Sequence, residues 1–280
     1  MKKIVSTIVN GILCFITAPF LLWACSFKSL YINDIKNASS QQITDESKTL
    51  TEQDIQHLPL LVQQYIRNCG FIGKPPVNHF KATFEGRIRN KEQQIWMPFS
   101  CEQHNFLQLT HRLFFMDAKM KGLPVKGYHY FKNGKAVMDI RLLSLFNVQY
   151  AEGKEMDISE TVTFFNDMCF MAPAMLIDPR IKWISSTENE VYCSFTNNGI
   201  TITVTLIFNE KGDIINFISE DRYAYFQDGS MSILKWQTPV TEYKTINGYR
   251  LPSHAEMIYT YPDGDFCYGE FSLKNISFLN

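Results

Sequence analysis

Apolar and polar positions alternate along much of the chain from about residue 80 onward. Phe80, Ala82 and Phe84 take every second position, and Lys81 and Thr83 lie between them. A period of two buries one face of a strand and leaves the other in water, which is typical of antiparallel sheets. The pattern predicts strands at 80–85, 94–99, 105–111, 114–119, 127–131, 136–150, 191–196, 200–209, 214–225, 231–243, 249–259 and 265–278.

Short turns rich in Gly, Asn and Asp separate many of these strands. Asn133-Gly134 and Asn247-Gly248 are signals of two-residue hairpins, and Pro262-Asp263-Gly264 joins the last two strands. Sequential hairpins indicate a meander that buries one face by curling into a barrel or half-barrel. We therefore expect a mainly β (α+β) fold, an antiparallel curved sheet or half-barrel, in one globular domain over 51–280.

Two helices are expected beside the strands. Residues 51–70 place apolar side chains at helical spacing and predict a leading amphipathic helix. Between the two sets of strands, Asp157 with Glu160 forms a variant of the capping box, which predicts a helix over about 158–171 that ends before Pro173. Because this central helix is apolar on nearly every side, we expect it to pack on the concave face of the sheet.

An uncharged apolar segment occupies residues 4–24, directly after Lys2 and Lys3. Its length suits a helix that spans a bilayer, and the basic start favours a domain on the non-cytoplasmic side. The sequence Leu22-Trp23-Ala24-Cys25 resembles a bacterial lipobox, in which Cys25 is acylated after cleavage. Residues 1–25 are therefore a lipoprotein signal, an uncleaved single-span anchor or an ordinary cleaved signal peptide. Each alternative predicts a location in the bacterial cell envelope.

The segment after the apolar run is polar. Residues 33–49 read NDIKNASSQQITDESKT and contain few bulky apolar side chains. Such a composition cannot bury enough surface to fold by itself, so residues 26–50 are expected to form a tether.

Charge and cysteine usage exclude some classes of protein. Lys and Arg number 27 against 28 Asp and Glu, so no broad positive field attracts nucleic acid. The cysteines after Cys25 are odd in number, and no two have the CxxC spacing, so a disulfide framework or a zinc site has little support. We expect buried reduced thiols at Cys69, Cys101, Cys169, Cys193 and Cys267.

No catalytic signature is present. The HExxH, GxSxG, GxGxxG and P-loop patterns are missing, and the six His residues are scattered, so we expect no metal site and no cofactor. Glu152, Glu155, Asp157 and Glu160 form an acidic group with two interpretations. They stabilise the start of the central helix, or Glu155 and Asp157 act as paired carboxylates of an enzyme in a cleft.

Several short blocks together resemble a bacterial family of unknown function whose members often carry N-terminal membrane segments. The blocks are Leu58-Pro59 leading to Tyr65 and Gly70, Trp96-Met97-Pro98-Phe99, 120–127, Gly153-Lys154-Glu155-Met156-Asp157 and Tyr261-Pro262-Asp263-Gly264. This resemblance implies no activity. The order of a leading helix, a meander, a central helix and a second meander is also similar to the half-barrel of LolA-like lipoprotein carriers, which implies a concave apolar face able to hold an acyl chain.

The favoured function is a non-enzymatic envelope protein that binds a lipid or another apolar molecule in its half-barrel, because Phe and Met are abundant in the central helix. Two alternatives remain: an enzyme that acts on an envelope substrate, and a structural or interaction domain with a filled core. The expected partners are the membrane, through the N-terminal segment, and an apolar ligand. The residues expected to line the cavity are Trp96, Phe114, Met116, Phe165, Met168, Met171 and Trp183.

Overall fold

One antiparallel sheet dominates the fold. The computed structural model describes residues 27–42, 48–91, 94–226 and 228–279. Within these ranges the sheet has 14 strands, in the order β6-β5-β4-β3-β2-β1-β14-β13-β11-β10-β9-β8-β7, and β12 also pairs with β13. The strands are β1 His79–Ile88, β2 Met97–Phe106, β3 His111–Met120, β4 Leu123–Lys132, β5 Lys135–Leu142, β6 Phe146–Glu152, β7 Ile181–Ser186, β8 Glu190–Asn197, β9 Ile200–Phe208, β10 Ile214–Tyr225, β11 Met231–Gln237, β12 Val240–Ile246, β13 Tyr249–Tyr261 and β14 Gly264–Leu279.

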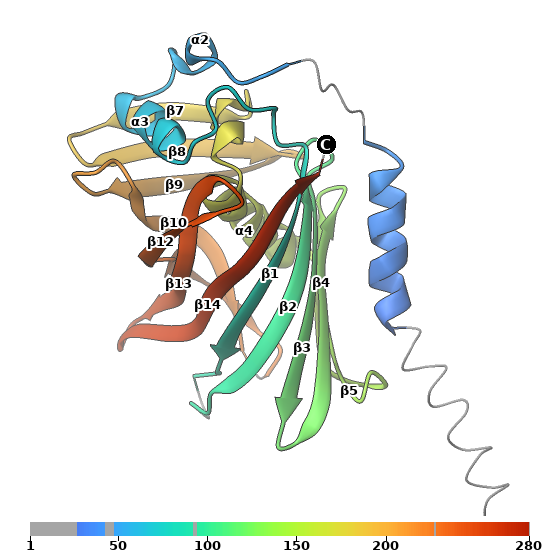
Figure 1. Ribbon diagram of the computed structural model, residues 1–280. Helices are drawn as coiled ribbons and strands as arrows, with labels where there is room; N and C mark the ends of the chain where they lie inside the picture. The colour runs from blue at the N-terminus through green and yellow to red at the C-terminus, as the bar shows by residue number, and fades with distance from the viewer. Residues whose placement is uncertain (1–26, 43–47, 92–93, 227, 280) are drawn as a thin grey trace, which may run out of the picture.

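The sheet curls into a half-barrel, and a long helix lies inside the curve (Figure 1). This helix, α4 at Lys154–Met171, has most of its residues buried and contacts β10 and several other strands. A short 3-10 turn at Pro173–Ile177 follows it. The mainly β half-barrel with a central helix, predicted from the alternation and the hairpin signals, is confirmed.

Several element boundaries differ from the prediction. The two strands expected at 94–99 and 105–111 are one strand, β2, and β3 begins at His111. The runs 136–150 and 231–243 are each divided into two strands, and β7 had not been predicted. The expected leading helix is also divided, into α2 at Glu52–Ile55 and α3 at Leu60–Asn68, because Pro59 lacks the N–H of a continuous helix and restricts the residue before it.

The sheet has two wings, a first wing of β1–β6 and a second wing of β7–β14, and they meet at one end. Arg180, just before β7, donates to the hydroxyl of Thr110 at 2.5 Å and to the carbonyl oxygen of Leu107 at 3.4 Å, both in the turn between β2 and β3. At the same end a Cβ on Gly134 would lie 2.8 Å from Asn198, so the β4–β5 turn touches the β8–β9 turn. These contacts close the half-barrel at the end opposite to the β3–β4 turn.

Aromatic side chains fill the space between α4 and the second wing. Phe165 stacks on Phe195 of β8 with ring centroids 4.9 Å apart, and it also meets Phe217 of β10. Tyr65 of α3 donates its hydroxyl to the carbonyl oxygen of Cys169 at 3.1 Å. The core therefore fixes the second half of α4 against β8, β10 and α3.

Residues 27–39 are helical and lie against the convex face of β2, β3 and β4 (Figure 1). Phe27, Tyr31 and Ala38 are almost fully buried on this face, with Ile35 packed beside them. This outer helix stands where a polar tether was expected over 26–50. The apolar side chains recur at helical spacing, but they are few and separated by polar residues, so composition alone concealed the helix.

Polar contacts complete the docking of the outer helix. The hydroxyl of Tyr31 donates to the carboxylate of Glu102 at 3.1 Å. The carboxylate of Asp34 accepts hydrogen bonds from Tyr128 and Lys132, each at 2.6 Å. The position of the chain at Phe27 is thus fixed relative to the sheet.

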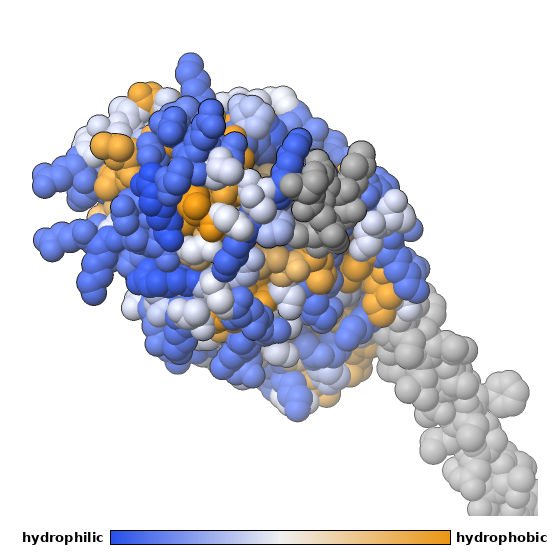
Figure 2. Space-filling view, turned by 45° about the horizontal axis from the view of Figure 1, so that its top comes forward, coloured by the Kyte–Doolittle hydropathy of each residue, from blue (hydrophilic) through white to orange (hydrophobic). Residues whose placement is uncertain are grey.

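One face of the molecule is mostly polar. Hydrophilic side chains cover most of the face shown in Figure 2, and the hydrophobic ones form small separate areas. Among the described residues, no helix is both long and apolar enough to cross a membrane. The apolar segment 4–24 and Cys25 lie outside the described residues. In the described part of the chain Cys69, Cys101, Cys169 and Cys193 are buried free thiols, and Cys267 is half-buried.

Candidate functional site

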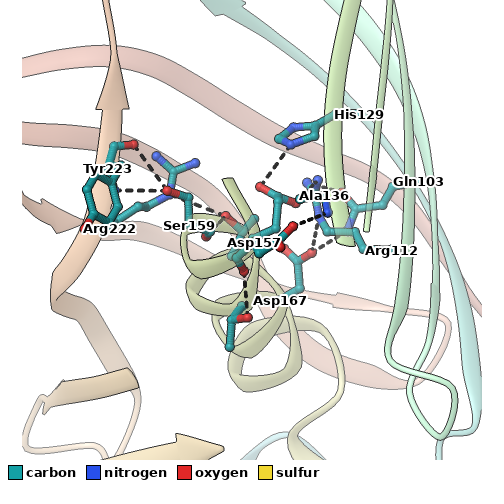
Figure 3. A network of polar contacts seen from close by, with 12 residues as sticks. Gln103, Arg112, His129, Ala136, Asp157, Ser159, Asp167, Arg222 and Tyr223 are labelled. Carbon is teal, nitrogen blue, oxygen red and sulfur yellow. Dashed lines mark hydrogen bonds and ion pairs between the residues drawn. The ribbon is translucent and has the colours of Figure 1, made fainter. Parts of the chain in front are cut away.

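The start of α4 is held by the first wing. The helix begins at Lys154 with Gly153 as its N-cap, and the φ of 109° at Gly153 favours glycine. Asp157 therefore lies inside the first turns and is not the cap that the sequence had predicted. Its carboxylate instead accepts hydrogen bonds from the backbone N–H of Ala136 and from Lys135, both at 2.8 Å, which ties α4 to β5 (Figure 3).

A cavity of about 250 Å³ lies between α4 and the concave face of the sheet. Its apolar wall is made by side chains of the first wing and the centre of the sheet, together with the last turn of α4. These include Phe84, Ile88, Phe114, Met116, Ile140, Phe170, Met171 and Phe271. The opposite wall is polar, and its side chains come from α4 and from strands on both sides.

One face of α4 supplies the polar wall. Glu160, Thr163 and Asp167 follow one another at spacings of three and four, which brings them to one side of a helix, and Asn166 lies beside them. Asn166 is held in place because its amide donates to the hydroxyl of Thr238 at 2.6 Å. An otherwise buried helix thus presents a polar stripe to the cavity.

Arg112 of β3 connects the two carboxylates of this stripe. Its guanidinium donates to Asp167 at 2.7 Å and to Glu160 at 3.3 Å, and a third hydrogen bond reaches Gln103 at 3.1 Å. Asp167 also accepts from the amides of Gln103 and Asn105, at 2.7 and 3.1 Å. Figure 3 shows Gln103 and Arg112 pointing from the strands toward Asp167 on α4.

Burial and charge set the protonation of this network in opposite ways. Burial alone would raise the pKa of Glu160, but His129, Arg112 and Arg222 lower it, and the pKa falls below its ordinary value. Burial raises the pKa of Asp167, and Arg112 offsets this only in part. The carboxylates raise the pKa of Arg112 against the effect of its own burial. Glu160 and Arg112 are therefore charged at neutral pH.

His129 of β4 lies next to Glu160. The Nε2 atom of His129 and the Oε1 atom of Glu160 are 3.2 Å apart, but their geometry is not that of a hydrogen bond, and both atoms are buried without another hydrogen-bond partner. Burial lowers the pKa of His129 to about 4, against the opposing effect of Glu160. At neutral pH a neutral imidazole thus faces a carboxylate oxygen with a free lone pair.

Arg222 of β10 closes the polar wall on the other side. Its guanidinium donates to the hydroxyl of Tyr259 and lies over the ring of Trp236, with 4.5 Å from its central carbon to the ring centroid. The hydroxyl of Tyr259 donates to the carbonyl oxygen of Tyr223 at 2.8 Å. These contacts bring strands of the second wing to the same cavity.

The residues proposed for the cavity from the sequence fall into two groups. Phe114, Met116 and Met171 line it. Phe165 and Met168 are fully buried in the core, Trp183 packs against that core from β7, and Trp96 lies beneath Arg87 and Arg89 outside the cavity lining. The polar members Arg112, His129, Glu160, Asp167 and Arg222 had not been proposed.

The carboxylates suggested for catalysis lie elsewhere. Glu155 is exposed, and Asp157 is occupied by Lys135 and Ala136. Neither lines the cavity, so the structure gives catalysis through this pair no support. In the described part of the chain, no three His, Cys, Asp or Glu residues come together in a way that could hold a metal ion.

Comparisons with known proteins give a family but no activity. The model of one family of unknown function matches residues 48–271, in keeping with the family resemblance of the sequence blocks. No curated protein matches the chain. A crystal structure named for an outer membrane lipoprotein-sorting domain, from Vibrio parahaemolyticus, is similar at 11% identity with a TM-score of 0.35, over 72% of this chain and 86% of the other. A DUF1329 family protein from Desulfovibrio piger is similar at 9% identity with a TM-score of 0.36, over 82% and 94%. At such scores these similarities carry no functional argument.

Proposed function

Because the chain belongs to the family of unknown function DUF6544, we propose a function from its cavity: it is an envelope-associated, non-enzymatic protein that binds a single-chain lipid or another elongated apolar molecule. The observation that carries the proposal is the cavity of about 250 Å³ beneath α4, with one apolar and one polar wall. Small-molecule sites generally combine such an apolar lining with a few convergent polar groups.

The size and lining of the cavity favour a slender ligand. A volume of about 250 Å³ is below the range of roughly 300 to 1,000 Å³ that is usual for drug-sized ligands, so a whole two-chain lipid does not fit inside. Met116, Met138, Met171 and Met257 all line the space. Flexible methionine side chains adapt to an acyl chain better than branched ones do.

The polar wall favours a ligand that ends in a hydrogen-bond donor. The guanidinium of Arg112 is already engaged by Asp167, Glu160 and Gln103. Oε1 of Glu160 remains buried without a hydrogen bond and can only accept one while the carboxylate is ionised. A hydroxyl or amine group satisfies this atom, whereas a carboxylate would be repelled by it.

The location in the envelope rests on the N-terminal sequence. Residues 4–24 carry no charged side chain and follow two lysines, as in signal peptides and single-span anchors. Fractionation of producing cells, with and without a Cys25→Ser substitution, separates the lipoprotein from the anchor alternative. Loss of a membrane-bound mature form only in the variant supports acylation at Cys25.

Ligand binding is tested on the full chain held in a detergent-free amphipathic polymer. Co-purified lipid is identified by mass spectrometry after extraction, and binding of a fluorescent single-chain fatty alcohol is titrated. We expect saturable binding, and at least tenfold weaker binding of the fatty acid of equal length. A chain that is empty after purification and leaves both probes unbound contradicts the proposal.

A cavity-filling variant provides the matched comparison. Gly127 of β4 lines the cavity, and a Cβ there would meet the flexible end of Met116 at 3.2 Å. Gly127→Val therefore fills space without removing a contact, and we expect it to weaken binding of the alcohol at least tenfold. Ser100→Val, on an exposed position of β2, is the control and should bind as the unsubstituted chain does.

The alternative of a purely structural domain expects a solid interior. The cavity beneath α4 argues against that alternative, since well-packed cores hold few voids larger than a water molecule. Equal binding of the alcohol by the Gly127→Val and Ser100→Val variants would favour the structural alternative over ligand binding in the cavity.

A further inference from the structure

Three connections between neighbouring strands of the first wing lie at the same end of the sheet. In the order β6-β5-β4-β3-β2-β1, neighbouring strands run in opposite directions, so the β1–β2, β3–β4 and β5–β6 connections share one end. Neighbouring strands are about 4.8 Å apart, which places adjacent tips roughly 10 Å from one another. We name this end the hairpin rim and define it by Ile95, 119–123 and 143–146.

Large apolar side chains are exposed along the hairpin rim. Ile95 is 70% exposed, Met120 43%, Leu123 48% and Phe146 60%. At the other end of the same strands, Gln108 is the exposed residue of the turn Leu107-Gln108-Leu109-Thr110, and Asn133-Gly134 forms the next turn. Exposed apolar side chains at successive tips, with polar exposed residues in the turns at the other end, point to a contact surface at the rim.

Basic side chains accompany the apolar ones. Lys119 and Lys121 are exposed on either side of Met120 in the β3–β4 hairpin. Apolar side chains flanked by lysine are typical of surfaces that lie in the interfacial region of a bilayer, where lysine meets anionic head groups.

The N-terminal side of the chain joins the domain at this same rim. The ring of Phe27 lies 4.3 Å from the guanidinium carbon of Arg141. Arg141 is next to Leu142, which pairs with Phe146 of the rim. In Figure 1 the end of the outer helix that begins at residue 27 points toward the end of the sheet where β3 and β4 are joined.

The docked outer helix fixes this geometry. Tyr31 is bonded to Glu102, and Asp34 is bonded to Tyr128 and Lys132, so the point at Phe27 cannot swing away from the sheet without breaking buried contacts. Only Cys25 and Ser26 separate the uncharged apolar run 4–24 from Phe27. A membrane bound by that run would therefore lie next to the hairpin rim.

We propose that the hairpin rim is a membrane-contact surface, in which Ile95, Met120, Leu123 and Phe146 enter the interfacial region of an anionic bilayer. The occupant is the lipid surface itself, chosen because the chain that follows the apolar run enters the domain at Phe27, at the end that carries the exposed lysines. The proposal does not depend on the cavity holding a ligand.

The test uses the full chain reconstituted into vesicles of phosphatidylcholine with phosphatidylglycerol as the anionic component. A fluorophore is attached at Leu123→Cys or Phe146→Cys, and at Gln108→Cys as the control from the opposite end of the same meander. Labelling of the unsubstituted chain gives the background from the native cysteines. Quenching by lipids with a nitroxide on the acyl chain is then measured.

We expect quenching of the Leu123 and Phe146 probes to be at least twofold stronger than that of the Gln108 probe. Omitting phosphatidylglycerol, or adding Met120→Glu, should reduce quenching at Phe146. Equal quenching at both ends, or failure of the chain to associate with vesicles, overturns the proposal. Crosslinking between rims of two copies without quenching would instead make the rim a protein interface, which also overturns it.

Discussion

Replacing Arg112 by Met should destabilise the protein strongly, because it removes the cation that holds two buried carboxylates. The side chain of Arg112 is 8% exposed, that of Asp167 15%, and that of Glu160 is fully buried. Breaking a buried ion pair by removing one partner costs about 3 to 5 kcal/mol, since a charge that stays buried loses its nearest counterion. We expect the free energy of unfolding of Arg112→Met to fall by about this amount.

Two further variants make the assay specific. Arg87→Met removes an ion pair with Glu270 on the surface, where the arginine side chain is 49% exposed, and should lower the free energy of unfolding far less than Arg112→Met does. Adding Asp167→Asn to Arg112→Met removes one uncompensated charge and should restore about 1 kcal/mol or more. Unfolding in urea at pH 7, followed by tryptophan fluorescence, measures all of them.

The difference in unfolding free energy between Arg112→Met and Arg87→Met tests whether the carboxylates of the polar wall are desolvated. If Arg112→Met costs no more than Arg87→Met, the two carboxylates are solvated and the polar wall is not a desolvated site. Failure of Asp167→Asn to restore stability in the Arg112→Met background would likewise show that the charges do not interact.

Three more outcomes are expected. The pKa of His129 is lowered to about 4 in the folded chain against 6.5 for the free side chain, so the unfolded chain binds more protons between these values. His129 should therefore contribute about 3 kcal/mol to the loss of stability as the pH drops from 6.5 to 4, beside His79 and His104, whose pKa values burial also lowers. A loss that is undiminished in His129→Gln contradicts this. Gly86→Ala should cost about 2 kcal/mol or more in thermal unfolding, because its Cβ would lie 2.2 Å from the backbone oxygen of Glu270; a melting temperature within a degree or so of the unsubstituted chain would rule this out. Tyr31→Phe removes the hydrogen bond to Glu102 and should speed amide hydrogen exchange over 27–39 about fivefold, with little change in global stability. Unchanged exchange in this segment would mean that the hydrogen bond does not hold the outer helix.

The sheet could be predicted because its signal is local. Alternation such as Phe80, Ala82 and Phe84, followed by turns such as Asn133-Gly134, specifies strands and hairpins without distant information. The strand ends were less predictable. His104 and Asn105 are polar yet buried within β2, one against His79 and the other against Asp167, so a polar stretch did not mark the turn that had been expected there.

Half of the candidate site could not be read from the sequence. Glu160, Thr163 and Asp167 have the spacing of one helix face, and this signal was available within an apolar helix. Their partners were not, since Arg112 lies 48 residues before Glu160, and Arg222 lies 59 residues after Thr163. Only the curl of the sheet brings these side chains together.

The outer helix could not be predicted from amino-acid composition. Its polar residues outnumber the apolar ones, so composition indicated a tether, whereas Phe27 and Tyr31 are almost fully buried against the sheet. A few anchoring aromatics at helical spacing decide whether such a segment docks.

The pairing of β1 with β14 determines when this domain can be completed during synthesis. All ten residues of β1 align with the last strand, so His79 finds its partner at Leu279, 200 residues further along the chain. Two adjacent central strands are thus the first and the last strand of the sheet in chain order, and they can pair only after β14 has left the ribosome. Such distant pairing makes folding slow, and a nascent chain lacking its final strand exposes the bare edge of β1 to any factor that delivers or protects it.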